Sequence, residues 1–349
     1  MKTYYRPTGL VFGADVARMV RDGDALPLAG MAHVGFTHVD VITRDKGVVE
    51  RDMQRISGVD DSAALTRLSE KRPDFAGIDL SQPCIMGIVN VTPDSFSDGG
   101  DFASADAAIA HGLRLVEEGA DIVDVGGEST RPGSSSPDVA EERRRVLPVV
   151  TALSRAGAVV SVDTRRAEIM RAAIGEGARI VNDISALTFD PNALAVVAQS
   201  AASVVLMHMQ GEPATMQKAP HYDDAPGEIA GYLAARAHAC RLAGLAPGRI
   251  AVDPGIGFGK TVAHNLQILG AIERLKAVGY PVLIGVSRKS FIGKLSRGEA
   301  AKERLPGSLA AALAAVARGA DIVRVHDVAA TRQALAVWQA IEDQAPPKG

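Results

Sequence analysis

Short apolar runs recur along the chain and alternate with stretches of helical spacing. The runs are rich in Val and Ile and lack regular polar alternation, which is typical of strands buried on both faces of a parallel sheet. They occupy residues 84–91, 121–127, 159–164, 180–185, 203–209, 250–256, 281–287 and 321–328. Eight such strands that alternate with helices over about 260 residues predict the α/β class and a (β/α)8 TIM barrel.

The junctions between helices and strands share a short pattern. Gly-Ala-Asp-Ile-Val occurs at residues 119–123 and 319–323, and Gly-Ala-Arg-Ile-Val occurs at 177–181. A glycine in this position predicts the end of a helix that leads directly into the next strand. Ser104 and Ser308 are the expected N-caps of two of these helices.

An open, doubly wound sheet is the competing architecture. Such a sheet usually carries a G-x-G-x-x-G dinucleotide fingerprint after its first strand. Here the first strand is followed by NVTPDSFSDGG, from Asn90 to Gly100, which lacks that spacing. The barrel is therefore the favoured prediction.

Residues 1–83 lie before the first barrel strand. Residues 30–43 have the composition of a strand, and residues 62–72 that of a short helix. We expect residues 1–83 to form an N-terminal extension that packs on the barrel, and residues 84–345 to form the catalytic barrel domain. A separately folding N-terminal domain is the alternative.

The charge balance excludes several classes of partner. Charged residues make up 23% of the chain and the net charge is -3, so there is no basic field for nucleic acid or an anionic membrane. The sequence has neither a signal peptide nor a membrane-spanning apolar run. Cys84 and Cys240 are too few for a disulfide scaffold and are expected as reduced thiols. We therefore expect a cytoplasmic protein without nucleic-acid or membrane partners.

Polar residues gather where the predicted strands end, which is where a barrel of this type carries its site. Asp, Asn and Ser are also favoured wherever a strand turns into a helix, because they satisfy free backbone groups. This explanation is weaker for Arg, Lys and His, which rarely point into a barrel mouth without an anionic partner. The candidate positions are Asn90, Thr130, Arg131, Asp163, Asn182, Met207, Asp253, Lys289, Ser290, Arg324 and His326.

These candidates fall into two chemical groups. Arg131, Arg324 and His326 suit phosphate oxygens, and the oxygen of Asn90 nearby suits Mg²⁺ bound to a diphosphate. The second group is rich in hydrogen-bond acceptors, and an amide with carboxylates can recognise the N–C–N edge of a flat heterocycle. Its members are Asp163, Asn182 and Asp253, with Lys289 beside them.

The stretch DPGIGFGK, residues 253–260, ends like a phosphate-binding loop. The G-x-x-x-x-G-K-[ST] motif needs glycine at the position of Pro254, so we reject a nucleotide-triphosphatase interpretation. We expect these glycines to let a ligand approach closely, with Phe258 as an apolar wall. His208, at the end of the fifth predicted strand, is either a buried histidine satisfied by the backbone or a catalytic one.

The strand-end motifs resemble, in their order, those of one enzyme family. IMGIVNVTPDSFSDGG (85–100) followed by GADIVDVGGESTRPG (119–133) resembles the paired signature of the dihydropteroate synthases. SVDT, VNDIS, MHMQG, DPGIGFGK, GVSRKSFIG and RVHDV then follow in the family's order. The resemblance covers about residues 84–335 and leaves residues 1–83 unexplained.

The resemblance implies a transferase of folate biosynthesis. The family joins p-aminobenzoate to 6-hydroxymethyl-7,8-dihydropterin diphosphate, which gives 7,8-dihydropteroate and diphosphate. It also implies a requirement for Mg²⁺, a homodimer, and inhibition by sulfonamides, which mimic p-aminobenzoate. The separation of cation-holding from anion-holding groups motivates the hypothesis of a dissociative substitution.

Carried over motif by motif, the resemblance implies three groups of binding residues. The pterin would be held by Asp163, Asn182, Met207, Asp253 and Lys289, of which Asp163, Asp253 and Lys289 are the candidate catalytic residues. The diphosphate would be held by Asn90, Arg131, Arg324 and His326, with Asn90 as the metal ligand. The p-aminobenzoate pocket would be lined by Thr130, Pro132, Phe258 and Ser290.

Two alternatives of other classes stay open. A pterin-dependent methyltransferase domain would share the barrel and the acidic pocket but would not need Arg131, Arg324 and His326. A non-catalytic pterin-binding paralogue would usually lack residues of the site loops, and none of them is missing here. A generic barrel enzyme with a phosphate site is what the fold alone suggests.

Overall fold

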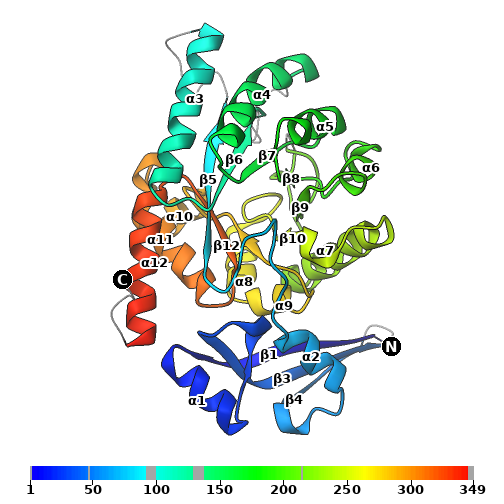
Figure 1. The fold of residues 1–349 in the computed structure, drawn as a ribbon. Coiled ribbons are helices and arrows are strands. Elements are labelled where there is room, and N and C mark those ends of the chain that lie inside the picture. The colour runs from blue at the N-terminus through cyan, green and yellow to red at the C-terminus, as the bar shows by residue number, and fades with distance from the viewer. Residues whose placement is uncertain (1, 46–47, 92–99, 129–136, 214, 345–349) are drawn as a thin grey trace.

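The computed structural model describes residues 2–45, 48–91, 100–128, 137–213 and 215–344. The chain forms an N-terminal antiparallel sheet and a larger barrel, which lie one above the other in Figure 1. Among the described residues, no helix combines the length and the apolar composition that a bilayer crossing requires.

The barrel wall is an eight-stranded parallel sheet in the described residues. Its spatial order is β10-β9-β8-β7-β6-β5-β12-β11. A parallel bridge between Val252 and Val282 joins the two ends of this order, so the sheet closes into a ring. The predicted (β/α)8 TIM barrel is confirmed. Its strands are β5 (Cys84–Asn90), β6 (Ile122–Gly126), β7 (Val160–Asp163), β8 (Ile180–Asp183), β9 (Ser203–Met207), β10 (Ile250–Asp253), β11 (Leu283–Ile284) and β12 (Ile322–Val325).

Helices follow the strands and cover the outside of the ring (Figure 1). Their apolar faces pack on the outward side chains of the strands in one continuous core. The helices are α3 (Gly100–Glu117), α4 (Val139–Arg155), α5 (Ala167–Gly175), α6 (Ala193–Ala198), α7 (Ala225–Leu242), α8 (Val262–Leu269), α9 (Ile272–Lys276), α10 (Ser290–Leu295), α11 (Leu305–Val316) and α12 (Val328–Asp343).

The helices that lead into these junctions end as predicted, but two of them begin at residues other than those expected. Gly119 and Gly319 have φ near +98° and +100°, a conformation that favours glycine, and each lies between a helix and the next strand. The expected caps are wrong, because α3 begins at Gly100 and α11 at Leu305, so Ser104 and Ser308 lie inside their helices. The hydroxyl of Ser308 instead donates to the carbonyl of Arg304, four residues earlier.

The N-terminal part is an antiparallel sheet with β3 at its centre. The strand and helix expected in residues 30–43 and 62–72 are present as β3 and α2. β3 pairs with β1 on one side and with β2 and β4 on the other. The elements are β1 (Lys2–Phe12), α1 (Ala14–Asp22), β2 (Leu26–Pro27), β3 (Val34–Asp45), β4 (Val48–Arg55) and α2 (Ser62–Ser69). A small core, which includes Phe36 and Leu68, holds them together.

This sheet lies at the end of the barrel opposite to the carboxyl ends of the strands (Figure 1). It contacts the last turns of α9 and α12, which run antiparallel to the strands. Arg6 of β1 pairs with Glu273 at 2.8 Å, and His33 packs edge-on against Trp338. The N-terminal sheet therefore lies away from the carboxyl ends of the barrel strands. The division of the chain into domains at residue 83 stays a prediction.

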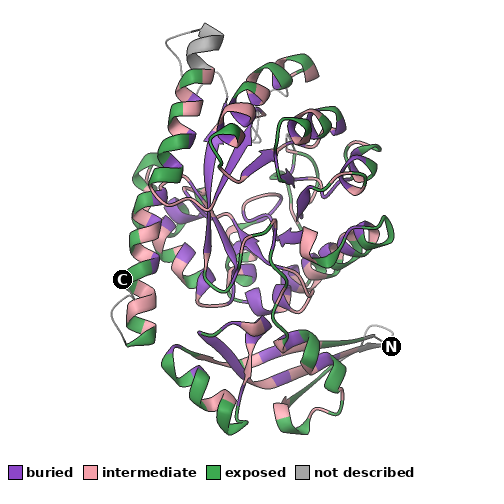
Figure 2. Ribbon diagram, viewed as in Figure 1, coloured by how far each residue is buried: buried purple, intermediate pink, exposed green. Residues whose placement is uncertain are grey.

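An apolar layer fills the lower interior of the barrel. Phe75, from a short hairpin that precedes β5, is fully buried within it. Figure 2 shows that the barrel strands are mostly buried, while the outer faces of the helices are exposed. The hairpin thus closes the amino end of the barrel. The main members of this layer are Phe75, Met86, Ile122, Ile180, Val205, Ala251, Leu283 and Ile322.

A buried ion pair ties α9 to the beginning of β12. Lys276 donates to both carboxylate oxygens of Asp321, at 2.7 and 2.6 Å, and both residues are at most 3% exposed. Asp321 also accepts from the backbone N–H of Val282 at 2.6 Å. The carbonyl of Lys276 accepts from Arg72, so the pair lies where the N-terminal part meets the barrel.

We predict that Lys276→Met destabilises the protein by about 3–5 kcal/mol, because it leaves the carboxylate of Asp321 buried without its cation. The double variant Lys276→Met/Asp321→Asn should lose less, since no unpaired charge remains. Urea unfolding followed by circular dichroism measures both. A double variant that is less stable than the single one would contradict this account.

Candidate active site

Polar side chains form a layer directly above the apolar one inside the barrel. Successive residues of a strand point to opposite faces, so a residue two positions beyond an inward apolar side chain also points inward. This rule leads from Ile122 to Asp124 and from Ile322 to Arg324. In (β/α)8 barrels such layers hold four side chains from alternate strands. The polar layer here consists of Asp124 (β6), Asn182 (β8), Asp253 (β10) and Arg324 (β12).

Asp124 is the centre of this layer. It has no exposed surface, and its Oδ2 accepts hydrogen bonds from the Nε of Arg324 at 2.7 Å and the amide of Asn182 at 3.0 Å. A second nitrogen of Arg324 donates to Asp163 at 2.8 Å. Three of the predicted site residues are thereby brought together around a carboxylate that the prediction did not include. Arg324 stands at the boundary between the acceptor-rich group and the anion-binding group.

The two predicted catalytic carboxylates lie in a site that disfavours their charge. Burial raises the pKa of Asp163 to about 7, against the opposing effect of Arg324. Burial also raises the pKa of Asp253, although the N–H of Gly255 donates to it at 2.7 Å and Lys289 lies nearby. Carboxyl groups of this kind are sensitive to any ligand that donates hydrogen bonds or gains positive charge.

Lys289 lies over the face of Phe258, with its Nζ 4.2 Å from the ring centroid. Burial lowers the pKa of this lysine to about 8, while Asp253 and Asp163 favour its charged form. The structure therefore places the pterin candidate Lys289 against Phe258, a candidate for the p-aminobenzoate pocket. The charges of Asp163 and Asp253, the other two pterin candidates discussed here, act on the same lysine.

His326 lies at the end of β12 and is expected to be neutral. Burial and the charges of Arg288 and Arg324 lower its pKa to about 3. Its Nδ1 lies 3.0 Å from the hydroxyl of Ser287, across the gap between two strand ends. His326 can thus offer an anion one hydrogen bond but not a full charge.

The turn that carries Lys289 is fixed from two sides. Arg288 has a φ of +59°, which is uncommon for a side chain of its size. Its guanidinium pairs with both oxygens of Asp327, at 2.5 and 3.1 Å, and its N–H donates to Ser308 at 2.9 Å. These contacts stabilise the strained backbone next to Lys289.

The remaining candidates lie around the same mouth or outside the described residues. Asn90 ends β5, Met207 ends β9 and is 4% exposed, and Ser290 is the exposed first residue of α10. Thr130, Arg131 and Pro132 fall outside the described residues.

Two consecutive arginines after β7 hold the residues on either side of 129–136. Arg165 donates to both carboxylate oxygens of Glu128, at 2.7 and 3.2 Å. Arg166 donates to the carbonyl of Pro137 at 2.5 Å and pairs with Glu142 at 3.1 Å. Glu128 and Pro137 are thus both held by the segment that directly follows the strand supplying Asp163.

The glycine-rich stretch approaches protein backbone, which corrects an expectation. A Cβ on Gly255 would lie 2.1 Å from the carbonyl oxygen of His208, and one on Gly259 would lie 2.4 Å from that of Gln210. These two glycines therefore allow the loop after β10 to lie against the end of β9, and the expectation that they admit a ligand is wrong. Gly257 faces the side chain of Lys289 instead.

Lys260 is buried behind this loop and uses its three donors within the protein. Its ammonium group contacts the carbonyls of Phe258 and His208, at 2.8 and 3.3 Å, and the Nδ1 of His208 at 3.1 Å. Burial lowers its pKa to about 7. Lys260 thereby fixes the backbone of Phe258 and does not offer its charge to a phosphate, in keeping with the rejected phosphate-loop interpretation.

His208 is buried, as in the first of the two alternatives, but the partner of its ring is the side chain of Lys260 and not the backbone. It is 8% exposed, packs edge-on against Tyr232, and has its pKa lowered to about 3 by burial and by Lys260. A neutral ring with Nδ1 as acceptor satisfies Lys260.

Asp124 is the main site residue that the sequence reasoning missed. Asp124 lies inside an apolar run, before the end of its strand. Candidates from the sequence were sought only where the strands end. The repeated junction pattern contains the missing signal, because the fifth residue after Gly119, Gly177 and Gly319 is Asp124, Asn182 and Arg324 in turn. In the structure, Asn182 and Arg324 both donate to the residue at the equivalent position of β6, Asp124.

Comparisons with known proteins identify the family of this chain. The family model described as "Pterin binding enzyme" matches residues 86–326. The dihydropteroate synthase of Neisseria meningitidis serogroup C is 53% identical over 268 residues, which is 76% of this chain and 94% of the relative.

Solved structures give the same result. A Xanthomonas albilineans dihydropteroate synthase with 4-aminobenzoic acid is 51% identical with a TM-score of 0.73, and covers 79% of this chain and 99% of its own. A structure of that organism's enzyme in complex with 7,8-dihydropteroate is 49% identical with a TM-score of 0.69, at 77% and 96% coverage. The chain belongs to the pterin-binding enzymes and, among them, to the dihydropteroate synthase family.

Proposed function

We propose that this transferase joins p-aminobenzoate to 6-hydroxymethyl-7,8-dihydropterin diphosphate and releases 7,8-dihydropteroate and diphosphate in folate biosynthesis. The observation that carries the proposal is the cluster of Asp124, Asp163, Asn182 and Arg324 in the barrel mouth. Acceptors beside a guanidinium suit a substrate that has a donor-rich ring at one end and a diphosphate at the other.

The acceptor-rich residues hold the pterin in this account. Asn182 and the carboxylates of Asp163 and Asp253 can accept from the N–C–N edge of the ring. Met207 is buried at the same level and offers an apolar contact to a flat ring. Lys289 adds a donor over the ring of Phe258.

The diphosphate is assigned to Asn90, Arg131, Arg324 and His326, with Mg²⁺. The described residues contain no cluster of three or more His, Cys, Asp or Glu suited to a metal ion. The donor set still fits Mg²⁺, which usually takes few protein ligands and keeps substrate phosphates and waters. When bound through Asn90, the ion would stabilise the negative charge of the leaving diphosphate.

The ring of p-aminobenzoate is assigned to Phe258, Thr130, Pro132 and Ser290. Phe258 is held through its own carbonyl by the buried Lys260. A fixed aromatic wall lets the amine approach the pterin methylene with little loss of freedom on reaction.

We propose a dissociative substitution. The bond between the methylene carbon and the diphosphate oxygen breaks first, and its electron pair leaves with the diphosphate. The cation left on the methylene spreads into the pterin ring, where the carboxylates of Asp163 and Asp253 favour it. The amine nitrogen then forms the new C–N bond and loses one proton.

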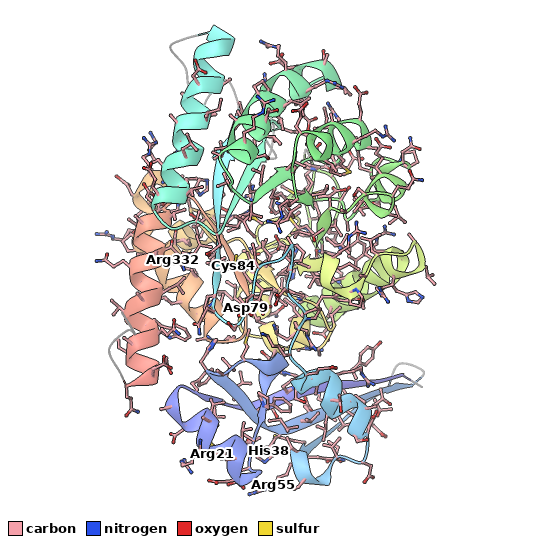
Figure 3. The ribbon with its side chains drawn as sticks, viewed as in Figure 1. Arg21, His38, Arg55, Asp79, Cys84 and Arg332 are labelled. Carbon is pink, nitrogen blue, oxygen red and sulfur yellow. The ribbon has the colours of Figure 1, made fainter. Side chains whose placement is uncertain are left out.

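Localisation and assembly are also proposals. Cys84 and Cys240 are both free and buried, which suits a reducing compartment such as the cytoplasm. Figure 3 shows Cys84 close to Arg332, at the lower end of the barrel. Burial raises the pKa of Cys240 to about 11, so this thiol is a poor nucleophile. The family resemblance supports a homodimer, which light scattering on the purified protein tests.

Diphosphate release tests the reaction. We predict that the purified enzyme with Mg²⁺ and the pterin diphosphate releases diphosphate only when p-aminobenzoate is added, and that a sulfonamide suppresses the release. Phe258→Ala should raise the KM for p-aminobenzoate, since it removes the aromatic wall. Pterin binding without release would favour the non-catalytic paralogue, and the proposal would fail.

A secondary isotope effect tests the dissociative step. Two deuterium atoms on the pterin methylene should measurably slow kcat/KM if the carbon becomes planar before attack, because planar carbon loosens the C–H bending modes. Competitive turnover of labelled and unlabelled substrate measures the ratio. A ratio near unity would instead indicate that the amine attacks as the diphosphate leaves.

The pH dependence of pterin binding tests the role of Asp163. Its pKa of about 7 lies above the ordinary value, so the acceptor form is lost as the pH falls through 7. We predict that the affinity for 7,8-dihydropteroate, measured by calorimetry, weakens by up to tenfold per pH unit below 7 and levels off above 8. Asp163→Asn should bind more weakly at pH 8 and lose this dependence. A wild-type affinity that is constant between pH 6 and 8 would refute the assignment.

A further inference from the structure

A groove lies between the N-terminal sheet and the barrel helices α7 and α9. Its volume is about 260 Å³, and its walls come from β1, β3, α2, α7 and α9. A cavity of roughly 150 Å³ in another protein already holds benzene, so this volume is enough for a bicyclic molecule. Junctions between folded units are common places for small-molecule sites.

The charge of the lining points to an anionic ligand. Three arginines face the groove, namely Arg6, Arg67 and Arg274, whereas the described residues that line it include no carboxylate. The carboxylates that pair with these arginines stand outside the lining. Glu273 holds Arg6 at 2.8 Å, and Asp224 holds Arg274 through two bonds of 2.8 and 2.9 Å.

These ion pairs orient two of the guanidinium groups before any ligand arrives. Arg6 uses its Nε and one Nη on a single oxygen of Glu273, and Arg274 uses both Nη atoms on Asp224. Arg67 is freer, with its side chain 61% exposed and 3.9 Å from Asp61. A fixed pair with one adaptable arginine is suited to capture a carboxylate or a related oxyanion.

Apart from Thr3, the rest of the lining consists of apolar, small or aromatic residues. Leu68 and Ile42 are buried at the back of the groove, and Tyr5 lies beside them. On the opposite side, α7 presents small residues, including Ala230 and Ala234. A flat apolar body therefore fits between the two walls, with its charged end toward the arginines.

We propose that this groove binds an organic anion with a flat, apolar body, and that the bound molecule contacts both the N-terminal sheet and the barrel. One wall comes from residues that precede the matched family region, which begins at residue 86. The site thus belongs to this chain's own N-terminal addition. None of the candidate catalytic or substrate-binding residues lines the groove, and its proposed role does not rest on the proposed reaction.

Calorimetry with 2-naphthoate tests the site on the full-length protein. The anion should bind at least tenfold more tightly than the neutral 2-naphthamide, because the arginines contribute only to the charged form. Ala234→Phe, which fills the groove without changing its charge, should weaken binding at least tenfold. Arg67→Gln, which removes the adaptable cation, should weaken it about fivefold.

Matched variants separate this site from other binding. Ala235→Phe changes an exposed residue of the same helix that does not line the groove, and Arg21→Gln removes an exposed arginine of α1, labelled in Figure 3, that does not line it either. Both should bind like the wild type. Equal binding of acid and amide, or naphthoate binding that Ala234→Phe leaves unchanged, would overturn the proposal. If Ala234→Phe leaves binding unchanged, the naphthoate binds at another site, such as the catalytic mouth. An unaltered unfolding midpoint of each variant excludes misfolding.

Discussion

One buried carboxylate, that of Asp124, organises the centre of the barrel mouth. A single oxygen of this group accepts from both Arg324 and Asn182, and Arg324 continues to Asp163. Burying a lone carboxylate costs several kcal/mol unless it is paired and hydrogen-bonded. The polar layer can therefore lie on top of an apolar one only because Arg324 and Asn182 are bonded to Asp124. The same bonds hold the side chains in place before substrate arrives, which reduces the reorganisation that the reaction requires.

The electrostatics of the site follow from this arrangement. Asp163 and Asp253 ionise reluctantly because they are buried, while Lys289 and His326 lose charge readily for the same reason. Arg324 keeps its charge, and it is shared between the acceptor-rich group and the expected position of the diphosphate. In the proposed reaction, the pterin would gain positive charge beside the acceptor-rich residues, and the leaving diphosphate would gain negative charge beside the anion-binding residues. The reaction would therefore balance the charge of both groups of residues.

The sequence predicted the barrel because its buried parallel strands are continuous apolar runs, and it predicted Asp163, Asn182 and Arg324 because strand ends meet at one face. It did not predict Asp124, since a charge inside an apolar run has meaning only once the partner across the barrel is known. Gly255 and Gly259 were misinterpreted for a related reason. Their close neighbour is the backbone that follows β9, and a contact between loops of different strands leaves no local pattern.

The affinity of Asp124→Asn for 7,8-dihydropteroate, measured by calorimetry, tests the central claim most directly. The exchange keeps the shape of the side chain but removes the charge that holds Arg324, and bonds to charged groups contribute about 1.5–3 kcal/mol. The account predicts a loss of roughly 10- to 100-fold. Asp121→Asn, the same exchange just before β6 at the opposite end of the barrel, should leave the affinity unchanged. Wild-type affinity in a folded Asp124→Asn variant would contradict the account.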